Sequence, residues 1–238
     1  MRRHICLIAT TMISFAALES ETRAEHPYPP RLPENAFQVR LGVFAPDGGG
    51  TLWDDLDQRF ALGPSDFNGG AWGLSFVGGI NEHFEVGLNA DWYGRTVTTA
   101  DPLYVDTDGF PIVHDTTFRQ FPVGVDLRLV PTGRRPGKPV VFVGAGGGLS
   151  FWEYREVGDF VDESDPLLPV YFGEFHDSGQ SLEGRLLAGI EFPITPAFNL
   201  TFEGRYSFGE TELEGDLAGL GTIDRGGLWV FAGAGFRF

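Results

Sequence analysis

The last twelve residues, 227–238, constrain the fold more than any other stretch, because they alternate strictly between two kinds of side chain. With the period of two that a β-strand imposes, one face is apolar and uncharged. That face consists of Leu228, Val230, Ala232, Ala234, Phe236 and Phe238. On a tilted strand it would cover about 25–30 Å of hydrocarbon, so the pattern predicts a strand that crosses a lipid bilayer.

Composition supports a β-rich membrane protein and argues against several other classes. The chain has 34 Gly and 22 Phe among 238 residues, which favours many strands joined by turns. The net charge of −16 argues against nucleic acid as a partner, because phosphates require clusters of Lys and Arg. The single cysteine, Cys6, lies in a segment that we expect to be removed, so neither a disulfide nor a thiolate metal site is predicted.

The first 24 residues are typical of a secretory signal peptide. Arg2 and Arg3 form a positive n-region, residues 5–18 form an apolar core, and Ala24 closes a small-residue cleavage site. The alternative is a short membrane anchor, for which the apolar run is too short to span comfortably. Residues 25–35 form a Pro-rich N-terminal extension, and residues 36–238 form the β-barrel domain.

Alternation of the same kind recurs along the mature chain and predicts eight strands. The predicted strands are 36–45, 70–80, 83–97, 118–130, 140–152, 181–192, 198–208 and 227–238. Alternation is clearest in residues 83–97, where Val86, Leu88 and Ala90 alternate with Glu85, Asn89 and Asp91. A sheet of this length closes to remove its edges, and a membrane requires that closure.

The predicted connections alternate between long and short. The long ones are loops at 46–68, 98–117, 153–180 and 209–226, and a helical turn is expected in the first. The short ones include a basic turn at 131–139 that contains Arg134. Aromatic residues near the predicted strand ends are expected to form girdles at the membrane interfaces: Trp53, Phe60, Phe67, Trp72, Trp92, Tyr93, Trp152, Tyr154 and Tyr206.

By strand number, loop asymmetry and terminal Phe, the mature chain resembles the small OmpA-type, OmpX-type and OmpW-type outer-membrane barrels. The resemblance implies a monomeric, all-β, transmembrane antiparallel up-and-down barrel with short periplasmic turns and long external loops. It implies export to the outer membrane of a diderm bacterium, among outer-membrane lipid and lipopolysaccharide. Phe236 and Phe238 resemble the assembly signal that the barrel-assembly machinery reads in this class.

The predicted inward face carries charges of both signs. An eight-stranded barrel has room for little more than its own side chains, and an unpaired ion there costs several kcal/mol, so these charges are expected to pair. The predicted lumen charge network consists of Arg40, Glu85, Asp91, Arg95, Asp126, Arg128, Glu183, Arg185, Glu191, Glu203 and Arg205. The alternative is a narrow conducting or gated path.

Two other sites are weaker hypotheses. His176 and Ser178, with Glu191, resemble the His-x-Ser pair and carboxylate of barrel hydrolases that deacylate lipid A, although the run is expected to be loop and Gly179 replaces the usual Asn. The second hypothesis is that the acidic runs at 54–57 and 159–165 bind Ca²⁺ through their oxygen ligands. Neither run has the spacing of a dedicated calcium loop, and the alternative is solvated loops that hold divalent ions loosely near lipid headgroups.

We therefore expect no enzyme activity, no metal site and no cofactor. The sequence predicts an integral outer-membrane protein with a structural or surface-interaction role and a lumen filled by salt bridges. Two alternatives stay open: a narrow OmpW-like channel for small, hydrophobic molecules, and a lipid A-deacylating hydrolase.

Overall fold

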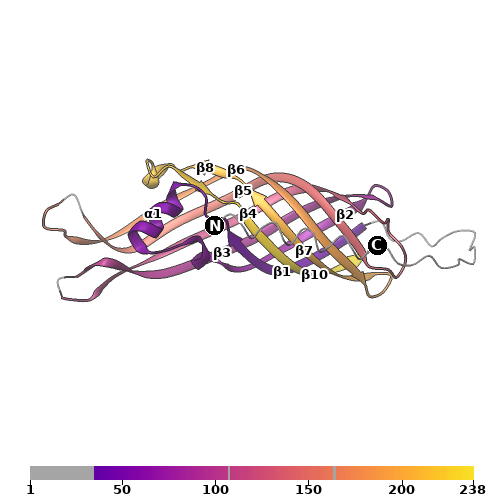
Figure 1. Ribbon diagram of the computed structural model, residues 1–238, viewed down its shortest axis with the longest axis horizontal. Coiled ribbons are helices and arrows are strands. Elements are labelled where there is room, and N and C mark those ends of the chain that lie inside the picture. The colour runs from indigo at the N-terminus through magenta and orange to yellow at the C-terminus, as the bar shows by residue number, and fades with distance from the viewer. Residues whose placement is uncertain (1–34, 107, 163–164) are drawn as a thin grey trace, which may run out of the picture. The chain divides into compact units, whose positions relative to one another are not determined.

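Eight long antiparallel strands close into a barrel in the computed structural model, which describes residues 35–106, 108–162 and 165–238 (Figure 1). The barrel strands are β1 (Asn35–Pro46), β2 (Gly69–Gly79), β3 (Phe84–Val105), β4 (Pro111–Leu129), β5 (Val140–Val161), β6 (Val170–Pro193), β7 (Phe198–Phe208) and β10 (Gly227–Arg237). The predicted signal peptide and all but the last residue of the predicted extension lie outside the described residues.

Each barrel strand pairs with its neighbour in the chain, and β1 pairs with both β2 and β10 to close the ring. Leu41 on β1, for example, lies opposite Trp72 on β2 and Ala232 on β10. Within the ring closure leaves no sheet edge, so the backbone of each strand there pairs on both sides. The predicted all-β, eight-stranded, up-and-down barrel is thereby confirmed.

The two faces of the barrel differ in polarity in the sense that the alternation predicts. Outward side chains are large and apolar, as with Leu41 at 67% exposed and Leu88 at 53%. Inward side chains are polar and buried, as with Arg40 at 0% and Asp91 at 1%. A continuous exposed apolar belt around a charged interior is the arrangement of a transmembrane barrel. Among the residues that the structure describes, no helix is both long and apolar enough to cross a membrane.

Two of the predicted loops are wrong, because β3 to β6 continue well beyond the apolar belt. Most of the predicted loop 98–117 belongs to β3 and β4, and most of the loop 153–180 belongs to β5 and β6. The β3–β4 register continues past Thr96↔Thr117 to Ala100↔Val113 and shifts once before Val105, and the β5–β6 register runs unbroken to Val161↔Val170. Sequence reasoning ended each strand where its outward residues became polar, but the backbone ladder continues there, with buried inward residues such as Thr116 and Tyr154.

The other two long connections fold over the barrel mouth. The first holds the helix α1 (Thr51–Phe60) and the 3-10 turn η2 (Pro64–Phe67). The last holds the short hairpin of β8 (Glu210–Glu212) and β9 (Thr222–Asp224) around the turn η3 (Gly215–Leu217). The two connections meet, because Trp53 Nε1 donates to the carbonyl of Asp224 at 3.0 Å and Thr51 Oγ1 to that of Leu220 at 2.6 Å.

An apolar cluster lies beneath α1 and corrects the predicted aromatic girdle. Of the nine aromatics predicted at the interfaces, Trp72, Trp92 and Tyr206 are exposed. Five others are buried in this cluster: Trp53, Phe67, Tyr93, Trp152 and Tyr154. Phe60 packs against the cluster from its edge. Tyr93, Trp152 and Tyr154 have inward parity on β3 and β5, whereas Trp53 comes from α1 and Phe67 from η2. The apolar face of α1 covers the strand rings at the barrel mouth.

Candidate functional site

The centre of the lumen holds a group of buried ion pairs that cross the barrel. Arg40 on β1 donates to Asp91 on β3 at 2.6 Å and to Glu203 on β7 at 2.9 Å. Arg205, two residues from Glu203, reaches the second Asp91 oxygen at 2.5 Å. Each of these four side chains is at most 2% exposed. Strands on opposite sides of the barrel are thus joined through shared carboxylates.

Asp126 extends this group along β4 and β6. It accepts from Arg185 Nε at 2.5 Å and from Asn89 Nδ2 at 2.5 Å, and Arg205 lies 3.6 Å away. The remaining members are Arg128, which donates to Glu203 at 3.0 Å, and Glu183, which lies 3.9 Å from Arg185. Four guanidinium groups thus face four carboxylates, so the central group is balanced in charge.

Glycines on β4 and β5 make room for this group. A Cβ added to Gly146 would overlap the Asp126 carboxylate, and one added to Gly124 would lie 2.5 Å from Arg185 Nη2. The same two Cβ atoms would, respectively, overlap the carbonyl oxygen of Val125 and lie 2.5 Å from that of Gly147, so neighbouring backbone as well as ionic side chains requires glycine at both positions.

A second group of ion pairs lies at the end of the barrel that carries the short turns. Glu191 accepts from Arg237 Nε at 2.8 Å and from Arg134 Nη1 at 3.1 Å, and Arg134 also donates to Glu85. Glu85 and Glu191 were predicted to belong to one network with the central arginines. In the structure Glu85 pairs with Arg134, and Glu191 pairs with Arg134 and Arg237. Arg237 has inward parity on β10, so the alternation does indicate that it lies in the lumen. Arg134 belongs to the turn at 131–139, which returns its side chain into the barrel end.

Two arginines differ from the sequence-based assignment in other ways. Arg95 is exposed, on the part of β3 beyond the belt, and stands apart from both groups of ion pairs. Arg225, which was predicted to lie in a loop, is 2% exposed between β9 and β10, and the carboxylates that act on it electrostatically are those of Glu183 and Asp224. No alternation could identify Arg225, because it enters the barrel from a connection and not from a barrel strand.

The proposed hydrolase residues do not assemble. His176 and Ser178 lie on β6 and not in a loop, and both are exposed on its outer face. Glu191 lies at the opposite end of β6, held by Arg134 and Arg237. The His176 imidazole lies near Glu153, with 3.7 Å between Nε2 and Oε1, and the His176 backbone N–H donates to Asp216 at 3.3 Å. This geometry provides no base oriented toward the Ser178 hydroxyl.

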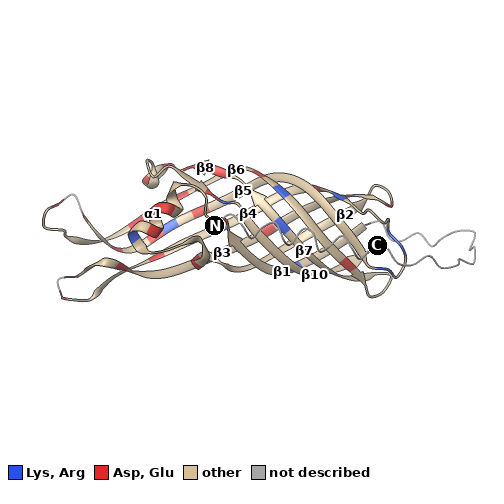
Figure 2. Ribbon diagram, viewed as in Figure 1, with Lys and Arg blue, Asp and Glu red and all other residues tan. Residues whose placement is uncertain are grey.

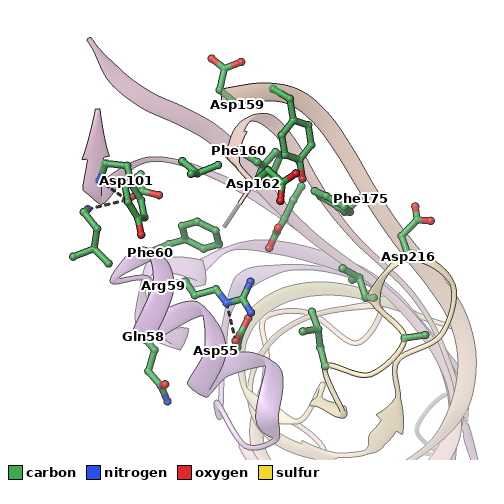
Figure 3. A pocket seen from close by; sticks show the side chains of 18 residues that line it. Asp55, Gln58, Arg59, Phe60, Asp101, Asp159, Phe160, Asp162, Phe175 and Asp216 are labelled. Atoms are coloured by element: carbon green, nitrogen blue, oxygen red, sulfur yellow. Dashed lines mark hydrogen bonds and ion pairs between the residues drawn. The ribbon is translucent and has the colours of Figure 1, made fainter. Parts of the chain in front are cut away.

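Beyond the apolar belt, β3 and β4 form one extended hairpin, and β5 and β6 form a second. A cavity of about 440 Å³ lies between α1, these two extended hairpins and η3 (Figure 3). Its carboxylates come from all of these elements: Asp55, Asp101, Glu156, Asp159, Asp162 and Asp216. Arg59 is its one lining cation among the described residues, and Arg59 Nε lies 3.0 Å from Asp55. Acidic residues gather around α1 and these hairpins in Figure 2.

Aromatic rings line the same cavity. Phe60 from α1 and Phe160 from β5 both contact the His114 ring, with centroid distances of 4.1 and 5.4 Å. Phe175 packs edge-on against Phe160 at 5.0 Å. Burial lowers the pKa of the His114 imidazole, so this ring, which packs against Phe60 and Phe160, stays uncharged at neutral pH.

The cavity and the lumen do not resemble a metal centre. Within the described ranges, no three His, Cys, Asp or Glu residues are grouped so as to hold a metal ion. The first acidic run lies on α1, and Asp159 of the second lies on β5; Figure 3 shows Asp55, Asp159 and Asp162 pointing in different directions.

Comparison with known proteins returned similarities in structure only. No family model matches the chain, and no curated protein matches it in sequence. Among solved structures, the chain is similar to the outer membrane protein OprG from Pseudomonas aeruginosa, with 14% identity, 87% of this chain and 97% of that one covered, and a TM-score of 0.49.

Two further solved structures show the same kind of likeness. Neisserial surface protein A has 12% identity, a TM-score of 0.46, and coverage of 86% of this chain and 96% of that one. Ail of Yersinia pestis has 15% identity, a TM-score of 0.42, and coverage of 86% and 99%. The description of the barrel rests on its own strand order and register.

Proposed function

We propose that this protein is an integral outer-membrane barrel with a closed lumen, which acts by presenting its long-connection end at the cell surface. In this proposal it neither conducts solutes nor catalyses a reaction. Outer-membrane lipid and lipopolysaccharide surround its apolar belt, the barrel-assembly machinery inserts it, and the mature protein is a monomer exported through a cleaved signal peptide.

One observation carries the proposal: three layers of side chains occupy the lumen in succession. The group centred on Glu203 is balanced in charge and nearly inaccessible, and the pairs of Glu85 and Glu191 with Arg134 and Arg237 lie at one end. At the other end, α1 covers an apolar cluster that includes Trp53 and Trp229. An ion would have to displace paired charges or cross this apolar layer, and both steps are costly.

The location at a cell surface is supported by the difference between the connections at the two ends of the barrel. The connections at one end are long and acidic, and two of them are paired hairpins, β3–β4 and β5–β6, whereas those at the other end are short and include the basic turn at 131–139. In bacterial outer-membrane barrels, long connections face outward and short turns face the periplasm. Extended hairpins held by their own ladders form a stable platform for contacts in the medium.

Planar-bilayer recordings on the refolded protein test closure. We expect no stepwise conductance from the unaltered chain at moderate voltage. A variant in which residues 51–60 are replaced by a Gly-Ser linker, and its combination with Arg40→Ser, show which layer seals the lumen. Defined current steps from the unaltered protein, changed in size by Arg205→Ser, would contradict the proposal and favour the narrow channel.

A further inference from the structure

The cavity above the barrel combines two features that ordinary solvent-facing loops lack together. It is concave and bounded by four elements that are separate in the chain, namely α1, the two extended hairpins and η3. Its volume of about 440 Å³ falls within the range of small-molecule sites, which is about 300–1,000 Å³. It opens on the side that the proposed function places in the medium.

The charge of its lining is strongly negative. Six carboxylates face one guanidinium, and Asp55 already holds that guanidinium, on Arg59. Asp101 accepts the backbone N–H groups of Leu103 and Tyr104, at 2.7 and 3.0 Å, which fixes its position at the wall without neutralising its charge. A concave site lined by one sign of charge concentrates counter-ions of the other sign.

Glu156 is the carboxylate that points most directly to a missing cation. It is 8% exposed and lines the cavity, and its hydrogen-bond partner is the neutral hydroxyl of Tyr154. Among the described residues no ion pair reaches it, whereas the buried carboxylates of the lumen are paired with arginines. A buried carboxylate without a cation is costly, and a positively charged ligand would remove that cost.

The rings of the cavity indicate the chemistry of such a cation. Phe60, Phe160 and Phe175 line its interior, while Asp159 and Asp216 lie at its rim (Figure 3). Ring faces attract ammonium groups and also pack against methylene groups. A hydrated metal ion would make no use of these rings, and the carboxylates do not converge as metal ligands within the described residues.

We propose that this cavity binds a small organic polycation, with ammonium groups on a methylene chain, by placing one ammonium group at Glu156 and the chain against Phe60 and Phe160. The remaining ammonium groups lie near the carboxylates of the rim. Spermidine has this chemistry and serves as the probe. The proposal uses the surface position of the cavity but does not require the lumen to be closed.

Isothermal titration calorimetry of spermidine into the refolded protein, in a non-ionic detergent at low salt, tests the proposal. We expect saturable binding with one site per chain. Glu156→Gln removes one charge inside the cavity and should weaken binding about tenfold or more. Glu174→Gln removes one charge from an exposed ion pair of the same hairpin, outside the cavity lining, and should change binding by less than about twofold.

Two further measurements separate the ring and charge contributions. Phe60→Leu keeps apolar volume but removes a ring face and should weaken spermidine binding about threefold or more. Mg²⁺ at equal charge concentration should screen the site without saturable binding of its own. Heat-modifiable migration on gels verifies that each variant is folded, and Phe60→Leu decides the matter should Glu156→Gln fail to fold.

Several outcomes would overturn the proposal. They are the absence of saturable spermidine binding, equal loss in Glu156→Gln and Glu174→Gln, and unchanged affinity in Phe60→Leu. Tighter binding of trilysine than of spermidine would exclude a free polyamine and assign the cavity to lysine side chains of a protein. Because these titrations are made in detergent, their failure leaves the conductance and cell-surface tests of the proposed function unaffected.

Discussion

Arg40 and Glu203 are 163 positions apart in the chain, yet Arg40 Nη1 lies 2.9 Å from Glu203 Oε1 in the centre of the lumen. The same carboxylate group accepts from Arg128 at 3.0 Å and Arg205 at 2.8 Å, so three strands converge on one side chain. Glu203 is therefore the point at which the balance of the central charges is most easily disturbed.

Glu203→Gln should lower the free energy of unfolding by about 3–5 kcal/mol, because it leaves buried guanidinium groups without their shared counter-charge. Glu174→Gln is the matched control, since it removes a carboxylate from an exposed ion pair with Arg155 and should have only a small effect. Guanidinium unfolding of both variants in lipid vesicles measures the difference. Similar midpoints for both variants would show that the central ion pairs do not stabilise the barrel.

Leu88→Arg should destabilise the barrel in lipid by about 2–4 kcal/mol, because Leu88 belongs to the apolar belt, where a charge would lie in hydrocarbon. Val105→Arg is the control, on the same strand but at the tip of the extended hairpin, in water. Unfolding titrations in vesicles compare the two. Equal tolerance at both positions would mean that the belt does not face lipid.

Labelling of whole cells tests the orientation. Asp108→Cys lies in the exposed connection between β3 and β4, and Arg135→Cys lies in the exposed short turn. Arg134 itself is unsuitable, because its side chain is turned into the barrel end toward Glu85. An impermeant thiol reagent should modify the cysteine at 108 and leave the one at 135 unmodified until the outer membrane is opened. The reverse pattern would invert the proposed orientation.

Removal of the terminal ring tests its role in assembly. Phe238 exchanges backbone hydrogen bonds with Asn35 at 3.0 and 3.3 Å, and its ring lies 6.3 Å from that of Phe236. Phe238→Ala keeps the backbone bonds, and full burial of such a ring contributes only about 1.5–3 kcal/mol. The purified variant should thus refold in vitro, while cells accumulate less of it in folded form. Normal amounts of folded variant in outer-membrane fractions would remove the assembly role.

Glu156 should give the free protein a distinct pH dependence. Burial raises the pKa of its carboxyl above the ordinary value, so the folded protein keeps this proton at a pH where the unfolded chain has lost it. The contribution of Glu156 to stability therefore falls as pH rises from the ordinary carboxyl pKa through the folded value. Glu156→Gln lacks this loss and should become progressively more stable than the unaltered protein as pH rises above about 4.

Unfolding midpoints of the two proteins across this pH range provide the measurement. Asp55, Arg59 and Tyr154, which act on Glu156 electrostatically or by hydrogen bonding, are present in both proteins. A constant difference in stability at all pH values would mean that Glu156 does not titrate within the range.

Local patterning determined the barrel strands and their faces. Side chains of a strand alternate with a period of two whatever the strand pairs with, so the outward position of Leu88 and the inward position of Glu85 follow from the chain alone. The number of strands follows in the same way, and the short turns force β2 to pair with β3, β4 with β5 and β6 with β7.

Only the tertiary structure decided which inward charges meet. Alternation puts Arg40, Asp91 and Glu203 inside, but their contact depends on how far the strands are staggered when the ring closes, and no local pattern carries that information. For the same reason Glu191 was assigned to the central group, whereas closure places it beside Arg134 and Arg237.

Elements outside the bilayer also depended on tertiary structure. Lipid enforces apolar outward residues only within the belt, so β3 to β6 continue into water with no further signal in polarity, and backbone pairing alone extends them to Val105 and Val161. The cavity at Glu156 arises because α1, two such hairpins and η3 meet there. Its carboxylates are far apart in sequence, and only the folded chain brings them around one set of rings.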